Sequence, residues 1–491
     1  MNKLALFGLL MLSYSGIEAQ APDWPTLDQA VRNLDNDPAM KSATWSLAVK
    51  DAQSGQVLYD HNRSKSLTTA STMKAMTTAT ALSVLGKDYR YETYLEYHGE
   101  LENGVLLGDV VIRGTGDPSL GSERFGEIHG LDPLMAMWAE KFQEAGIKKV
   151  SGRVIGDDSY FSTQLTPGEW TWEDMGNYYG AGASGLNVHE NMYYLILKPG
   201  SRVGSDAAIL RTNPPQPNLE WSNELKTGAS NSGDNAWIYG SHYSSVRHLR
   251  GTIPAGRSSF TIKGAISDPA WYCAYRFREE LIKCGIEVTG GPSTARRLNV
   301  AGERISGATH LVYTHYSPRL EEIVFHTNQK SINVFAEALG KTIAVKSGKK
   351  GDTVHGMEAV EDYWLGKGIQ TKGLYFRDGA GLSPTNAVST DFMTEVLCKM
   401  YRSDQYEAFK QSLPVAGRSG SLKSMLRGTL AEGKLFAKSG YINGVRAYTG
   451  YVQTQNGKIV AFALISNHYA CTAGQMRRKL EPVMAAIASY R

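Results

Sequence analysis

The segments richest in β-forming residues lie near the two ends of this 491-residue chain, and this constrains the fold more than any other feature. Residues 43–62 (ATWSLAVKDAQSGQVLYDHN) predict two strands joined by a turn at Ser54-Gly55. Residues 434–466 predict three more, and the last two flank Asn456-Gly457, a strong hairpin signal. We therefore expect one five-stranded antiparallel sheet of the α/β (α+β) class, flanked by helices such as one over 473–490. The two ends of the chain must fold together.

The middle of the chain differs from its ends in composition and pattern. Residues 91–304 contain short β-like pieces separated by stretches rich in Gly, Ser, Asn and Pro. An inserted domain whose ends lie close together need not disturb its host sheet. We expect a host domain formed by residues 22–90 and 305–491, with inserted β-rich domains over residues 91–304.

The first residues predict export. Met-Asn-Lys precedes an apolar run from Leu4 to Leu12, and small residues lead to Ala19-Gln20-Ala21. This is the pattern of a secretory signal peptide, which we place at residues 1–19. The run is far shorter than the roughly 20 residues that span a bilayer. We expect a periplasmic or otherwise extracytoplasmic protein, without a transmembrane segment once the signal is removed.

Residues 66–85 (SLTTASTMKAMTTATALSVL) place a lysine in an unusual setting. From Ala70 onward the run predicts a helix, on which Ser71 and Lys74 share a face. Lysines commonly lay their stems on apolar surface and keep the ammonium in water, so a lone Ser-x-x-Lys is ordinary. However, no Asp or Glu lies between Asp60 and Asp88. A lysine buried without a carboxylate would have a lowered pKa, and its neutral amine could take a proton from Ser71.

Composition argues against several other classes of function. The net charge is +4 with interspersed charges, so we expect no nucleic-acid partner. No Cys-x-x-Cys or His-Glu-x-x-His occurs, so we expect neither a metal nor another cofactor. Cys273 and Cys284 would stand too far apart on one helix to form a disulfide, whereas pairing of Cys398 with Cys471 stays open.

Three short motifs follow one another along the chain. Ser-x-x-Lys occurs at Ser71 to Lys74 and again at 347–350, where a loop rich in Gly and Lys would keep the lysine hydrated. Ser-x-Asn occurs once, from Ser331 to Asn333. Of three Lys-[Ser/Thr]-Gly tripeptides, only the one that begins at Lys438 lies in a predicted strand. Each motif alone is weak, and Ser331 with Asn333 would otherwise be interpreted as a helix cap or surface pair. The ordered set on helix, helical turn and strand is specific.

This ordered set resembles the three motifs of the penicillin-recognising serine enzymes. The long gap between the first two motifs is similar to that of the class C low-molecular-mass penicillin-binding proteins, the D-alanyl-D-alanine carboxypeptidases and endopeptidases. Other stretches also resemble family segments: GTGDPSL at 114–120, YGAGASGLNVHEN at 179–191, residues 317–333, DGAGLS at 378–383 and LPVAG at 413–417. The resemblance covers most of the mature chain. It implies a transpeptidase/β-lactamase-like domain.

The chain departs from the family pattern at three positions. Ser439 stands where threonine is more common, which keeps the hydroxyl. Ile332 stands where aspartate is common, and Tyr441 where a small residue usually follows the glycine. The large Tyr441 side chain is expected to narrow the pocket.

The resemblance implies a role for each motif residue. Ser71 would attack the carbonyl of the penultimate D-Ala and form an acyl-enzyme, and Lys74 would be its base, with a pKa depressed partly by Lys438. Ser331 would relay the proton to the leaving amine.

The remaining residues would bind the substrate. Asn333 would hydrogen-bond the substrate amide and orient Lys74, while Lys438 and Ser439 would bind the terminal carboxylate. The backbone N–H groups of Ser71 and Tyr441 would form an oxyanion hole. The implied partners are peptidoglycan stem peptides, with β-lactam antibiotics as covalent inhibitors.

Two rival functions fit the sequence less well. A serine β-lactamase needs a fast route for deacylation, but residues 334–437 contain no Glu-x-x-Leu-Asn, and Ser331 replaces the tyrosine of class C β-lactamases. A non-catalytic cell-wall scaffold would not need the full set of catalytic side chains. The choice between carboxypeptidase and endopeptidase activity, the role of the inserted domains and the oligomeric state stay open.

Overall fold

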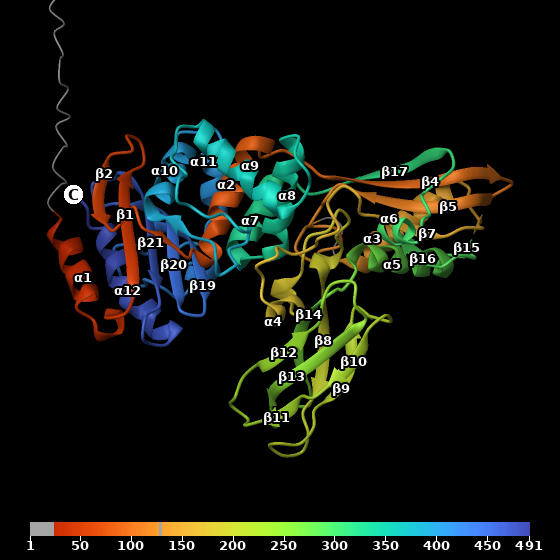
Figure 1. The fold of residues 1–491 in the computed structure, drawn as a ribbon, viewed down its shortest axis with the longest axis horizontal. Coiled ribbons are helices and arrows are strands. Elements are labelled where there is room, and N and C mark those ends of the chain that lie inside the picture. The colour runs from red at the N-terminus through yellow and green to blue at the C-terminus, as the bar shows by residue number, and fades with distance from the viewer. Residues whose placement is uncertain (1–23, 127–129) are drawn as a thin grey trace, which may run out of the picture.

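The computed structural model describes residues 24–126 and 130–491, so the expected signal peptide lies outside the described residues. Its main sheet joins the two ends of the chain in the order β19-β20-β21-β1-β2, with every neighbouring pair antiparallel (Figure 1). The strands are β1 (Thr44–Asp51), β2 (Val57–His61), β19 (Leu435–Ile442), β20 (Val445–Gln453) and β21 (Ile459–Asn467). The predicted five-stranded antiparallel sheet is confirmed.

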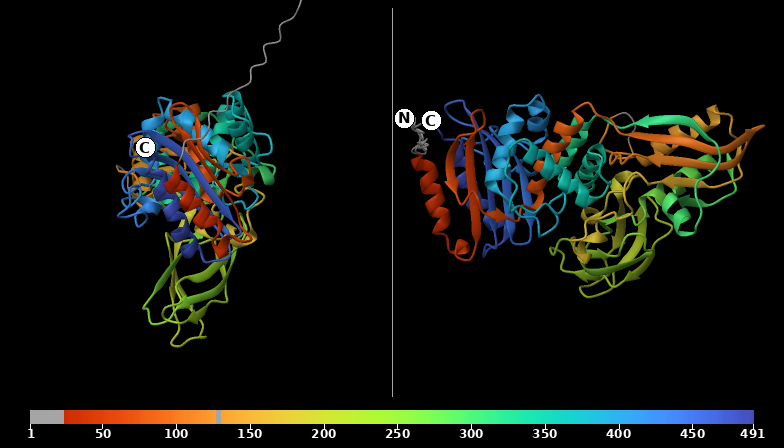
Figure 2. Two further views of the ribbon diagram at one scale, coloured as in Figure 1. Left: turned by 90° about the vertical axis from the view of Figure 1, so that its left-hand side faces the viewer. Right: turned by 45° about the horizontal axis from the view of Figure 1, so that its top comes forward.

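Helices cover both faces of this sheet because alternate side chains of each strand point to opposite sides. Along β21, Phe462 and Leu464 pack on one face, in the core with α1 (Pro25–Asp35) and α12 (Ala473–Ile487). Ala463 and Ile465 face the other core, which the remaining host helices share. These helices are α2 (Met73–Leu85), α7 (Leu320–Lys330), α8 (Asn333–Lys346), α9 (Thr353–Gly366), α10 (Thr390–Tyr401) and α11 (Tyr406–Ser412). Helices α1 and α12 lie side by side at the same end of the molecule (Figure 2).

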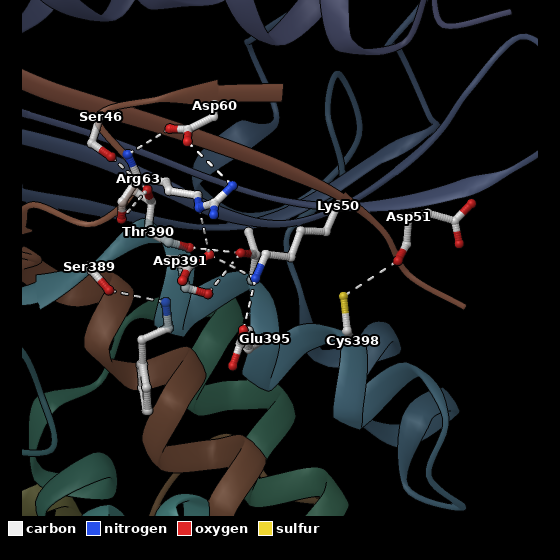
Figure 3. A network of polar contacts seen from close by, with 12 residues as sticks. Ser46, Lys50, Asp51, Asp60, Arg63, Ser389, Thr390, Asp391, Glu395 and Cys398 are labelled. Atoms are coloured by element: carbon white, nitrogen blue, oxygen red, sulfur yellow. Dashed lines mark hydrogen bonds and ion pairs between the residues drawn. The ribbon is translucent and has the colours of Figure 1, made fainter. Parts of the chain in front are cut away.

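A polar network ties α10 to the first two strands (Figure 3). The buried Lys50 of β1 pairs with Asp391 at 2.8 Å and with Glu395 at 3.1 Å. Arg63, after β2, also contacts Asp391, at 3.4 Å. A buried ammonium is tolerated when carboxylates surround it, so these pairs fix the register of helix against strand.

The four cysteines are free thiols. The Cys398 thiol donates to the backbone oxygen of Asp51 at 3.6 Å (Figure 3). Cys471 packs against a different core, the one that contains α1 and α12. The open question of a disulfide between them is therefore answered in the negative.

The middle of the chain forms further sheets that extend away from the main one (Figures 1 and 2). Seven strands form one sheet, in which β4 and β5 are the long central pair. Its strands are β4 (Glu92–Glu102), β5 (Val105–Gly114), β6 (Lys149–Val150), β7 (Val154–Asp157), β15 (Glu287–Val288), β16 (Pro292–Thr294) and β17 (Thr309–Tyr316), packed with α3 (Leu131–Glu144), α5 (Pro269–Lys283) and α6 (Ala295–Val300). Two smaller sheets contain β8 (Met192–Lys198), β9 (Ala208–Asn213) and β14 (Phe260–Ala265), and β10 (Glu220–Asn223), β11 (Lys226–Gly228), β12 (Asn235–Tyr239) and β13 (Val246–Pro254).

The expected end of the inserted part at residue 304 needs one adjustment. Strand β17 lies after residue 304, yet it pairs with β4 in the seven-stranded sheet. We therefore propose that the inserted part begins at about residue 91 and extends to about Tyr316, and that the host domain resumes at α7.

No helix within 24–126 or 130–491 combines the length and apolarity needed to cross a membrane.

Candidate active site

Ser71 lies in a short turn that leads directly into α2. Residues Ala70–Thr72 form a 3₁₀ turn (η2) and the α-helix begins at Met73, slightly later than expected from the sequence. Ala70 has φ of +44°, a left-handed conformation that is costly for a residue with a Cβ. Two glycines make room for this turn, because a Cβ on Gly381 would meet the Ala70 oxygen at 1.9 Å and one on Gly440 would meet the Ser71 nitrogen at 3.1 Å.

Lys74 lies one turn further along, fully buried, with its amine beside the serine. Nζ of Lys74 donates to Oγ of Ser71 at 3.0 Å, to Oδ1 of Asn333 at 2.6 Å and to the backbone oxygen of Ala380 at 2.5 Å. Its three contacts hold the amine in one place. The surrounding residues of α2 from Met73 to Leu82 are buried as well, so the amine is shielded from water.

Burial lowers the pKa of Lys74 from its ordinary 10.5 to about 7. Asp378 and Glu337, from distant parts of the chain, act in the opposite direction and raise the pKa, but desolvation outweighs their effect. Lys438, which the family resemblance suggested as a contributing cause, is not among the groups that shift the pKa of Lys74. The amine therefore loses its proton near neutral pH.

Ser331 and Lys438 meet across the site. Ser331 ends α7 in the left-handed conformation, with φ of 58°, which turns its side chain out of the helix. Its Oγ accepts a hydrogen bond from Nζ of Lys438 at 3.0 Å. The Lys438 ammonium also donates to the Ser439 backbone oxygen at 2.7 Å and is fully buried. Burial, together with Lys74, holds the pKa of Lys438 well below its usual value.

Asn333 is the first residue of α8, and its amide is held at both ends. Oδ1 accepts from Lys74, while Nδ2 donates to the backbone oxygen of Tyr179 at 2.7 Å. Tyr179 belongs to the inserted part of the chain. Because a carbonyl only accepts, it fixes which end of the amide faces Lys74.

Strand β19 forms the edge of the main sheet next to Ser71. Oγ of Ser439 contacts Oγ of Ser421 at 2.6 Å in an exposed position, so two hydroxyls lie together beside the strand. Tyr441 is 53% exposed and its ring lies 5.3 Å from the Arg446 guanidinium carbon. Its side chain therefore lies at the rim of the site, against its cross-strand neighbour.

The structure thus places Lys74 in contact with both Ser71 and Asn333, and joins Lys438 to Ser331. Sequence reasoning missed Glu337, Asp378, Ser421 and the carbonyls of Ala380 and Tyr179. Glu337 carried a usable signal, because it follows Asn333 by four residues on one helix and so shares its face. The carbonyls carried none, since every residue has one.

Within the part of the chain that the structure describes, no group of three His, Cys, Asp or Glu side chains is arranged to hold a metal ion.

Comparison with known proteins gives a consistent result. A model of the D-Ala-D-Ala carboxypeptidase 3 (S13) family matches residues 27–489. A D-alanyl-D-alanine carboxypeptidase from Actinomadura sp. (strain R39) is 29% identical over 446 residues, which cover 88% of this chain and 79% of that protein. The D-alanyl-D-alanine carboxypeptidase DacB of Haemophilus influenzae is 25% identical over 442 residues, which cover 89% of this chain and 88% of that protein.

The fold is also similar to a solved structure. Penicillin-binding protein 4 from Haemophilus influenzae superposes with a TM-score of 0.78 at 22% identity, covering 94% of this chain and 99% of that one. A second structure of that protein, complexed with a β-lactam, superposes with a TM-score of 0.74 at 21% identity, covering 94% of this chain and 98% of that one.

Proposed function

The chain belongs to the D-Ala-D-Ala carboxypeptidase 3 (S13) family, and we propose that it cleaves peptidoglycan stem peptides through an acyl-enzyme on Ser71. The enzyme class follows from the family, whose relatives are D-alanyl-D-alanine carboxypeptidases. The roles of the individual residues are our proposal. The observation that carries it is the buried Lys74 amine, 3.0 Å from the Ser71 hydroxyl and with a pKa of about 7.

In the first step Oγ of Ser71 attacks the carbonyl carbon of the penultimate D-Ala. The neutral amine of Lys74 takes the hydroxyl proton, which makes the oxygen a competent nucleophile. The backbone N–H groups of Ser71 and Tyr441 stabilise the oxyanion, and one such donor is typically worth about 3 kcal/mol.

Collapse of the tetrahedral intermediate breaks the peptide bond. Ser331 relays the proton from Lys74 to the leaving nitrogen, and Asn333 holds both the lysine and the substrate amide. Water then attacks the ester carbonyl, and Lys74 passes a proton from this water to Oγ of Ser71. The ester bond breaks, which releases the shortened peptide and free Ser71. One hard amide hydrolysis is divided into two easier steps.

The terminal carboxylate of the peptide binds at β19. The exposed hydroxyls of Ser439 and Ser421 donate to its oxygens. The buried Lys438 ammonium contacts the backbone oxygen of Ser439. Burial disfavours the charged form of Lys438 in the free enzyme. An arriving carboxylate favours the ammonium, so substrate binding and protonation of Lys438 reinforce each other.

β-Lactams present the same acyl group to the same serine, and we propose that they acylate Ser71 as covalent inhibitors. A relative's structure contains a bound β-lactam, which supports this proposal. A peptidoglycan substrate requires an extracytoplasmic enzyme. We therefore propose export to the periplasm or cell surface, with residues 1–19 as the signal peptide.

Product analysis tests the proposed activity. Purified enzyme is incubated with a pentapeptide ending in D-Ala-D-Ala and, separately, with cross-linked muropeptides, and the products are identified by mass. We expect release of D-Ala from the first, of monomers from the second, or of both, and no product from S71A. Product formation by S71A would contradict the proposal.

A further inference from the structure

The buried face of α8 extends beyond Asn333 with two charged residues. Glu337 and Lys341 follow at intervals of four residues, so all three side chains lie on one face of the helix. Glu337 is 1% exposed and Lys341 is fully buried. Buried charges are costly and persist where other groups compensate them.

Lys341 is compensated by the inserted part of the chain. Its ammonium donates to the backbone oxygens of Gln164, Leu165 and Ala183 at 2.8, 3.1 and 2.8 Å. All three ammonium protons are thus directed to carbonyls rather than to Glu337. The Glu337 carboxyl group hydrogen-bonds other neighbours.

One of these neighbours is Ala380, the residue that also contacts the proposed base. Oε1 of Glu337 accepts the Ala380 backbone N–H at 2.8 Å, and Oε2 accepts from the Thr353 hydroxyl at 3.3 Å. The carbonyl of the same Ala380 receives Nζ of Lys74 at 2.5 Å. Glu337 therefore binds the N–H of Ala380, and the carbonyl of the same residue binds Lys74.

The rest of this loop is fixed by Asp378. Its two oxygens accept from the backbone nitrogens of Gly381, Leu382 and Ser383, and from the side chains of Asn386 and Trp170. None of the groups that donate to Asp378 is the Ala380 N–H. Among the contacts of the described residues, this N–H donates to Glu337 alone.

The charged groups around Glu337 come from several elements. Lys74 faces it from α2, Asp378 from the 378–383 loop and Lys341 from its own helix, while Asp352 faces Lys341 from the start of α9 and Lys438 faces Lys74 from β19. Burial and Asp378 raise the pKa of Glu337. The Lys74 ammonium and the Glu337 carboxylate favour each other, so loss of charge on one promotes loss of charge on the other.

We propose that Glu337 is a positioning residue for Lys74, because it holds Ala380 by its backbone N–H and so keeps the Ala380 carbonyl against the amine. This inference rests on the proposed function, in which Lys74 is the base for Ser71.

Two substitutions test this role through the rate of acylation by a fluorescent penicillin, measured on the plateau of the pH profile. Glu337→Asp withdraws the carboxylate from Ala380, and we expect the plateau rate of the folded variant to fall about tenfold or more. Glu337→Gln keeps the length of the side chain and an oxygen for the Ala380 N–H, so its plateau rate should stay within about threefold of that of the unmodified enzyme.

Glu358→Gln on the exposed side of α9 is the matched control, since it removes a carboxylate that pairs with Lys349 at the surface. Its profile should coincide with that of the unmodified enzyme. An unchanged plateau rate in folded E337D, or a loss in folded E337Q as large as that in E337D, would overturn the inference. Parallel labelling of S71A and K74R separates this result from failure of the proposed function. Labelling of S71A would remove Ser71 from its role as nucleophile. A K74R variant whose rate falls with decreasing pH as in the unmodified enzyme would remove Lys74 from its role as base.

Discussion

The rate of Ser71 acylation should follow the deprotonation of Lys74. With a pKa of about 7, half of the enzyme carries the neutral amine at pH 7 and about 1% carries it at pH 5. Acylation by a penicillin should therefore be about 100-fold slower at pH 5 than on the plateau above pH 8. An ordinary lysine would behave differently, because its rate would continue to rise about tenfold per pH unit towards pH 10.

The assay is the second-order rate constant of labelling by a fluorescent penicillin, measured from pH 5 to 10 under conditions where the antibiotic itself is stable. Lys74→Arg supplies the control, since a guanidinium keeps its proton throughout this range. It should label very slowly at every pH and show no limb near pH 7. A wild-type limb centred near 10, or a limb near 7 that survives in K74R, would refute the reasoning that links burial of Lys74 to catalysis.

Two further predictions concern the groups that hold the site together. Gly440→Ala should strongly reduce penicillin labelling while the protein stays folded by circular dichroism, because the new Cβ would lie 2.7 Å from the Thr69 oxygen and push β19 away from Ser71; labelling at the unmodified rate would count against this. Trp170→Phe removes the indole donor to Asp378 at 2.7 Å and should lower the free energy of unfolding in urea by about 1.5–3 kcal/mol; a change below about 0.5 kcal/mol would contradict it.

The strands of the main sheet were predictable, because the β-rich segments at the two ends have clear boundaries and a clear hairpin at Asn456-Gly457. The change in composition over residues 91–304 was also visible in the sequence. The extent of the inserted sheet was not, since β17 pairs with β4 across more than two hundred residues. Such distant pairing leaves no local pattern.

The site residues were predictable to the extent that they carry distinctive side chains in ordered motifs. The structure brings Ser71, Lys74 and Asn333 together. The electrostatic environment was not predictable, because the carboxylates of Glu337 and Asp378 act on the pKa of Lys74 only through the tertiary fold. The backbone oxygen of Tyr179, which orients Asn333, has no sequence signature at all.

The most direct test of the account is to locate the penicillin adduct by mass. The protein is treated with penicillin, its intact mass is measured, and its peptides are mapped. The account predicts a single acyl group on the peptide that contains Ser71, and no adduct on the S71A variant. An acyl group on any other serine, or an undiminished adduct on S71A, would contradict it.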